Sequence, residues 1–89
     1  RRHVIVERLN AIKGFNCRTP MGAFYAFPSI AGTGQSARAV QDRLLNEAHV
    51  ATVAGTSFGH LGEDYLRFSY ANSVQNIEEA LERVACLYN

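Results

Sequence analysis

The stretch Tyr65-Leu66-Arg67-Phe68-Ser69-Tyr70-Ala71 decides the fold, because its residues alternate as those of a half-buried β-strand do. Successive side chains of a strand point to opposite faces of a sheet. The apolar set Leu66, Phe68 and Tyr70 therefore faces one way, and Arg67 faces the other way. We expect helices to cover the apolar face of this sheet and to leave the face of Arg67 open.

Three segments have apolar residues at helical spacing, and each has a helix boundary signal beside it. The first covers residues 2–13 and is followed by Gly14, a typical C-cap residue. The second follows Ser36 and the third follows Asn72-Ser73, which are typical N-cap residues. The faces expected to be buried are Ile5, Leu9 and Ile12 in the first segment, Ala37, Val40, Leu44 and Ala48 in the second, and Val74, Ile77, Leu81, Val84 and Tyr88 or Leu87 in the third.

Two further strands are predicted, one in the aromatic-rich residues 23–27 before Pro28 and one, buried, in the apolar residues 50–53. Residues 32–35 are predicted to be a loop. The element order is then helix, strand, helix, strand, strand, helix. It predicts an α+β fold with a small antiparallel or mixed sheet of three or four strands and with helices packed on one face.

The length of 89 residues is enough for one domain with one modest core, so residues 1–89 are expected to form a single domain. The formal net charge of +1 gives no basic field, and we expect neither nucleic acid nor membrane as a partner. No apolar run approaches the roughly 20 residues that span a bilayer. The chain opens on Arg1 and its only methionine is Met21, so we expect it to be a piece of a longer polypeptide.

The two cysteines, Cys17 and Cys86, are far apart and form no Cys-x-x-Cys pair. Two free, mostly buried thiols are expected, rather than a disulfide or a metal site. The three histidines, His3, His49 and His60, show no ligand spacing with each other or with the cysteines. We therefore predict no metal-binding residues.

Arg67 allows two interpretations. It could be a solvated charge or a surface ion pair, which contributes little to stability. It could also be a carboxylate-binding arginine, because packed apolar neighbours would hold its planar guanidinium ready for a bidentate contact. The spacing of the residues alone does not decide between them.

The segment Gly55-Thr56-Ser57-Phe58-Gly59 matches the G-x-S-x-G nucleophile elbow of serine hydrolases, which needs a strand before the serine and a helix after it. Residues 60–64 lead straight into the next predicted strand, so the helix is missing. No Gly-Lys-Ser/Thr follows to complete a phosphate-binding loop. We interpret residues 55–62 as a glycine-rich loop between two strands, and a nucleophilic Ser57 is the less favoured interpretation.

Five aromatic residues could stack on a ligand, although aromatic residues at strand spacing are more often part of a core. We expect most of them to be buried, with one on the open sheet face as the possible exception. They are Phe24, Tyr25, Phe27, Phe58 and Tyr70.

Several segments together resemble the class I/II (fold type I) aminotransferases, which depend on pyridoxal phosphate. Residues 19–28 (TPMGAFYAFP) are similar to the family's P-x-G-A-F-Y-x-F-P segment. Residues 55–71 (GTSFGHLGEDYLRFSYA) resemble its PG-x-x-FG-x-x-G-x-x-Y-L-R-[IF]-S-[YF]-A segment, and the YLRFSYA run is the most specific motif. Residues 76–84 resemble its closing helix, and residues 1–13 resemble the end of the helix that joins its large and small domains. The aspartate aminotransferase branch is the nearest form.

The resemblance implies a role for two residues. In the family, the arginine of the L-R-[IF]-S segment binds the α-carboxylate of the amino-acid substrate, and here that residue is Arg67. The resemblance also places Phe24 on the substrate side of the cleft. Ala54-Gly55 departs from the family's Pro-Gly and makes the entry to the loop less rigid. The only lysine, Lys13, matches no cofactor motif, so neither catalytic nor cofactor-binding residues are expected in this chain.

The resemblance further implies the C-terminal small domain of a cytoplasmic, homodimeric aminotransferase. The parent enzyme would transfer an amino group between an amino acid and a 2-oxo acid. Its pyridoxal phosphate would be held by a large domain outside this chain, and the chain alone would be inactive. The alternative from another class is a small regulatory amino-acid-binding module of α+β type, which would also use an arginine and a glycine loop. That module would bind an amino acid by itself, often as a dimer.

Overall fold

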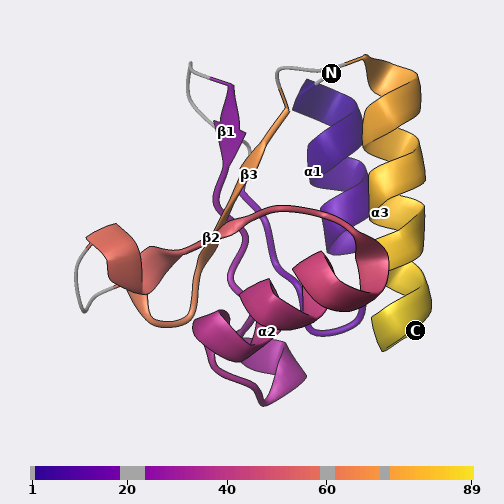
Figure 1. The fold of residues 1–89 in the computed structure, drawn as a ribbon. Coiled ribbons are helices and arrows are strands. Elements are labelled where there is room, and N and C mark those ends of the chain that lie inside the picture. The colour runs from indigo at the N-terminus through magenta and orange to yellow at the C-terminus, as the bar shows by residue number, and fades with distance from the viewer. Residues whose placement is uncertain (1, 19–23, 59–61, 71–72) are drawn as a thin grey trace.

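The strand predicted around Arg67 lies at the centre of the sheet. In a computed structural model, which describes residues 2–18, 24–58, 62–70 and 73–89, β3 (Leu66–Ser69) pairs antiparallel with two strands. These are β1 (Tyr25–Ala26) on one side and β2 (Val53–Ala54) on the other, which gives the order β1-β3-β2 (Figure 1). The predicted element order and the antiparallel α+β fold are confirmed.

The sheet widens at the end where β3 begins. Ser29, which follows β1 along the chain, forms antiparallel bridges with Tyr65 on one side and with Asn16 on the other. The bridge to Asn16 is closed by two backbone hydrogen bonds, of 2.9 and 2.7 Å. The segment around Asn16 therefore forms a short fourth row beside β1, in agreement with the predicted three or four strands.

The helices begin where their caps were predicted. α2 (Ala37–Arg43) follows Ser36, whose Oγ accepts a hydrogen bond from the backbone N–H of Ala39. α3 (Val74–Tyr88) follows Ser73, whose Oγ accepts from the N–H of Asn76. Such contacts satisfy N–H groups that have no partner within the helix. Asn72, which was predicted with Ser73 as the N-cap signal of the third helix, lies outside the described residues.

The helices also agree with the predicted single covered face. α1 (Arg2–Asn10) runs beside α3 and packs against it, on one side of the sheet (Figure 1). α2 continues into a π-helical turn, η2 (Leu44–Ala48), which contacts α3, while α2 itself packs against β2. Among the helices that the structure describes, none is long and apolar enough to cross a membrane.

The core lies between these helices and one face of the sheet. Leu66, Phe68 and Tyr70 are at most 4% exposed, which confirms the alternation expected for this strand. The predicted inner faces of the helices are buried as well, except that Val74 is 39% exposed and that Leu87 and Tyr88 are only half-buried. Val74 is the first residue of α3, and burial begins one turn later, at Ile77.

Some predicted boundaries were wrong. α1 ends at Asn10 instead of residue 13, because the chain tightens into i→i+3 bonds such as Ile12 N–H to the Leu9 carbonyl, and then turns at Gly14 with φ +91°. The paired part of the first predicted strand is only Tyr25–Ala26, and residue 23 lies outside the described residues. The predicted loop 32–35 starts with a 3₁₀ turn, η1 (Ala31–Thr33).

The second predicted strand, residues 50–53, is shifted in the structure. Pairing is confined to Val53–Ala54, Ala51 is exposed, and residues 50, 52 and 53 are only half-buried. The reason is that β2 is an edge strand with a paired neighbour on one side only. Its backbone is held instead by α2, because the side-chain oxygen of Gln41 accepts the N–H of Ala54 at 2.6 Å.

The two cysteines are both free, as predicted, but only one of them is buried. Cys17 is 4% exposed in the core, and this burial raises the pKa of its thiol, although a backbone hydrogen bond from Phe27 opposes the shift. Cys86 is exposed on the outer side of α3, so the expectation of a buried thiol was wrong there.

Candidate functional site

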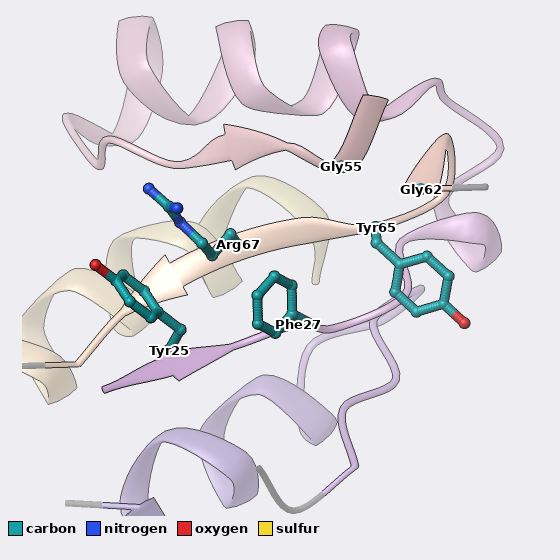
Figure 2. A pocket seen from close by; sticks show the side chains of 6 residues that line it. All are labelled: Tyr25, Phe27, Gly55, Gly62, Tyr65 and Arg67. Carbon is teal, nitrogen blue, oxygen red and sulfur yellow. The ribbon is translucent and has the colours of Figure 1, made fainter. Parts of the chain in front are cut away.

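An open pocket of about 370 Å³ lies on the sheet face that the helices leave uncovered. Its walls are mostly apolar, and Arg67 supplies the cationic group. Figure 2 shows the lining residues, which come from β1 and the residue after it, from β3 and the residue before it, and from the loop between β2 and β3. They are Tyr25, Phe27, Gly55, Gly62, Tyr65 and Arg67.

The position of Arg67 follows from the strand that carries it. β3 is paired on both sides, with Val53 opposite Arg67, and its neighbours Leu66 and Phe68 are fixed in the core. Arg67 is half-buried as a residue, and its Cζ lies 4.5 Å from the centroid of the Tyr25 ring (Figure 2). This cation–π contact favours one orientation of the side chain without neutralising its charge. The arrangement is suited to a planar anionic group such as a carboxylate.

Two glycines form the backbone wall of the pocket. A Cβ atom at Gly55 would lie 2.2 Å from the carbonyl oxygen of Gly62, so neither position has room for a side chain. The crossing is held by hydrogen bonds from the Gly55 N–H to the Tyr65 carbonyl (2.7 Å) and from the Tyr65 N–H to the Gly62 carbonyl (3.0 Å). These hydrogen bonds hold the two ends of the predicted glycine loop together, close to Arg67 in the sheet.

The aromatic residues divide between the two faces differently from the prediction. Tyr25 and Phe27 are 39% and 50% exposed and line the pocket, so the expectation that they belong to the core was wrong. Tyr70 is buried, as expected. The side chain of Phe58 lies outside the described part of the structure.

Phe24 does not line the pocket of Arg67. It is 57% exposed, and its ring packs edge-on against Tyr70, with ring centroids 6.3 Å apart. Because Tyr70 belongs to the covered face, the structure does not bring the two predicted substrate-binding residues, Phe24 and Arg67, together.

Sequence reasoning did not assign Tyr65 or the close approach of the two glycines to the site, and it named Tyr25 only as one of five aromatic residues that could stack on a ligand. The period-2 alternation places Tyr65 beside Arg67 on the open face, so this signal could have found Tyr65. The register between β1 and β3, which pairs Tyr25 with Ser69, becomes visible only in the structure.

The remaining candidates from the sequence are the nucleophile-elbow pattern, Lys13 and a metal site. Residues Gly55–Phe58 form a 3₁₀ turn, η3, and Gly59 of the elbow pattern lies outside the described residues. Lys13 follows α1, where its backbone N–H donates to Asn89 Oδ1. Within residues 2–18, 24–58, 62–70 and 73–89, no three His, Cys, Asp or Glu side chains gather as metal ligands would.

The profile of the family "Aminotransferase class I and II" matches residues 1–84. The chain belongs to this aminotransferase family. Among curated relatives, it is 44% identical to an aspartate aminotransferase of Pyrococcus horikoshii and 49% identical to the putative aminotransferase YugH of Bacillus subtilis. Each alignment covers 94% of this chain and 22% of the relative.

Solved aminotransferase structures contain the same fold. The aromatic aminotransferase of Pyrococcus horikoshii superimposes with a TM-score of 0.91 at 42% identity, over 97% of this chain and 23% of that one. The aspartate aminotransferase of Rhizobium meliloti gives a TM-score of 0.87 at 41% identity, over 96% and 23% of the two chains. The chain therefore spans a little over a fifth of the length of the aminotransferases that it matches.

Proposed function

We propose that this chain is the C-terminal small domain of a larger aminotransferase, and that Arg67 binds the α-carboxylate of the amino-acid and 2-oxo-acid substrates. The observation that carries the proposal is the position of Arg67, half-buried in an open and mostly apolar pocket with its guanidinium over Tyr25. The family membership and the small share of each relative that the chain covers support it.

The physical argument rests on the difference between this arginine and an ordinary surface arginine. The paired backbone of β3 and the Tyr25 ring limit the orientations of the guanidinium, so less side-chain entropy is lost when a carboxylate binds. The apolar walls reduce the screening of the ion pair by water. Fixing the carboxylate at one end of the substrate would orient the bonds at Cα, where transamination takes place.

Phe24 remains in the proposal as a second substrate contact, at the edge of the sheet rather than inside the pocket. Its exposed ring is supported from one side by Tyr70. A substrate would meet it where the rest of the enzyme closes the cleft over the sheet.

Pyridoxal phosphate, which the family generally uses, does not fit the residues of this chain. Its aldehyde carbon needs a lysine amine, and the only lysine, Lys13, is not among the residues that line the pocket of Arg67. We propose that the cofactor is held by a large domain, that α1 (Arg2–Asn10) is the end of the interdomain helix, and that the cytoplasmic parent enzyme is a homodimer. The chain alone would then not catalyse transamination.

The test is Arg67→Lys in the full-length enzyme. We expect kcat/KM for amino-acid substrates to fall at least tenfold, or about 1.4 kcal/mol in transition-state binding, because an ammonium cannot form the bidentate contact. Arg38→Lys, at an exposed position in the first turn of α2, is the matched control and should leave kcat/KM unchanged. An Arg67→Lys enzyme with near-normal kcat/KM would refute the anchoring role.

A binding experiment on the isolated chain distinguishes the proposed enzyme domain from the alternative, a regulatory amino-acid-binding module. An amino-acid-binding module should bind free amino acids on its own, whereas one wall of an enzyme cleft should bind them very weakly. Isothermal titration calorimetry of the 89-residue chain with a panel of amino acids distinguishes the two. A dissociation constant below about 100 µM, a binding free energy of about 5.5 kcal/mol, would favour the module.

A further inference from the structure

The edge strand β2 presents one backbone N–H group away from the sheet. Its two residues, Val53 and Ala54, pair with β3, which is its neighbour in the strand order β1-β3-β2. The next residue, Gly55, donates its N–H to the Tyr65 carbonyl on the β3 side at 2.7 Å. Consecutive N–H groups of a strand point to opposite edges, so the N–H of Ala54 points away from β3.

Gln41 of α2 accepts a hydrogen bond from this outward N–H group. Its half-buried side chain places Oε1 2.6 Å from the Ala54 nitrogen. Ala54 is only 1% exposed, so water has little room to replace the amide oxygen. α2 also packs against β2 and against η3, the turn that starts at Gly55. The hydrogen bond therefore joins α2 to the backbone directly before the pocket.

Gln41 lies beside the pocket without lining it. The residue after Ala54, Gly55, forms part of the pocket wall, and the residue before it, Val53, is paired with Arg67. Figure 2 shows Gly55 at the end of one strand and Arg67 on the adjacent one. A displacement of Ala54 would therefore move both a wall of the pocket and the strand neighbour of its arginine.

We propose that Gln41 is a positioning residue for the substrate pocket, and that it acts through the backbone of Ala54 rather than by touching a substrate. The inference rests on the proposed function of Arg67. Without an acceptor, the buried N–H of Ala54 is left unsatisfied, and β2 shifts to find another partner. The wall at Gly55 then moves relative to Arg67, and the substrate binds less tightly. Because this loss affects the bound substrate and the transition state alike, KM rises while kcat changes little.

The test measures kcat and KM of the cofactor-loaded, full-length enzyme with L-aspartate, L-phenylalanine and L-alanine as amino donors. Gln41→Leu removes the acceptor but keeps a side chain of similar size, and we expect it to raise KM about three- to tenfold with kcat within about twofold. A preparation that is partly unfolded loses kcat, whereas its folded molecules keep their KM. Gln75→Leu, at an exposed position in the first turn of α3, is the matched control and should leave KM unchanged.

A double-variant cycle tests the route through the backbone. Ala54→Pro removes the N–H group that Gln41 accepts, at an edge-strand position where a sheet tolerates proline. In that enzyme, adding Gln41→Leu should no longer raise KM, because there is no N–H left to satisfy. Gln41→Glu keeps an acceptor oxygen and leaves β2 unaltered, so its KM should stay within about twofold of the unaltered enzyme. An unchanged KM in Gln41→Leu, an undiminished effect in the Ala54→Pro enzyme, or an equal rise in Gln41→Glu overturns the proposal.

Arg67→Lys in the same assay separates this inference from the proposed function. If it lowers kcat/KM for every donor while Gln41→Leu leaves KM unchanged, the role of Gln41 is wrong and the α-carboxylate anchor stands. If Arg67→Lys keeps a near-normal kcat/KM while Gln41→Leu raises KM, the anchor fails, and Gln41 keeps its role through the wall at Gly55.

Discussion

The two faces of the sheet use similar residues for opposite purposes. On the covered face, Leu66, Phe68 and Tyr70 are buried against the helices. On the open face, Tyr25 and Phe27 keep 39% and 50% of their surface exposed. Aromatic side chains on the first face stabilise the fold by leaving water, whereas those on the second face give up that gain.

The difference locates the surface that the proposed substrate site would use. An open face with exposed aromatic rings around a half-buried arginine has apolar surface available for a ligand or for another part of the protein. The apolar side chains of β3 on the covered face are already buried within this chain. Substitutions should therefore separate into those that change the free energy of unfolding and those that change binding, according to the face that they alter.

The largest expected effect is on the covered face. Leu66→Ala removes a fully buried side chain from the central strand, and we expect the free energy of unfolding to fall by about 2–5 kcal/mol. Phe27→Ala, on the other face of the same sheet, should cost about 1 kcal/mol or less, although it removes a larger side chain. Urea denaturation of the 89-residue chain measures both. Equal losses would mean that the faces do not differ in this way.

The sequence was sufficient for the covered face, because its signals are local. Alternation in residues 65–71 identified the buried side chains of β3, and the serine caps identified the starts of α2 and α3. Each of these features depends on residues a few positions apart. The helix-facing side of the sheet could therefore be predicted in detail.

The open face was predicted only in part, because it depends on contacts between distant segments. The alternation located Arg67, but the ring beneath its guanidinium comes from Tyr25, 42 residues earlier in the sequence. The shift of β2 to Val53–Ala54 likewise depends on Gln41 of α2. The crossing of Gly55 and Gly62 is a tertiary contact, and the pattern of glycines shows only that a turn is favoured there.

The next largest effect is expected where the two glycines cross. Gly55→Ala places a methyl group 2.2 Å from a backbone oxygen that cannot move without breaking the Tyr65 hydrogen bonds. We expect the free energy of unfolding to fall by about 1–3 kcal/mol. Gly34→Asn is the control, because Gly34 has open space around it and asparagine tolerates its φ of +75°. It should lower stability less than Gly55→Ala does, because only the left-handed backbone conformation, and no clash, opposes it. A stable Gly55→Ala chain would show that the wall of the pocket is adaptable.

The smallest expected effect concerns the ring that supports Arg67, and it should appear in binding rather than in folding. Tyr25→Leu keeps an apolar side chain on the open face but removes the π surface that lies 4.5 Å from the guanidinium Cζ. The lost cation–π contact is worth about 0.5–1 kcal/mol, so kcat/KM of the full-length enzyme should fall about two- to fivefold. Tyr25→Phe retains the ring and should stay within twofold of the unaltered enzyme. If both variants lose activity equally, the phenolic hydroxyl rather than the ring face supports Arg67, and the open face then acts through hydrogen bonding at this position.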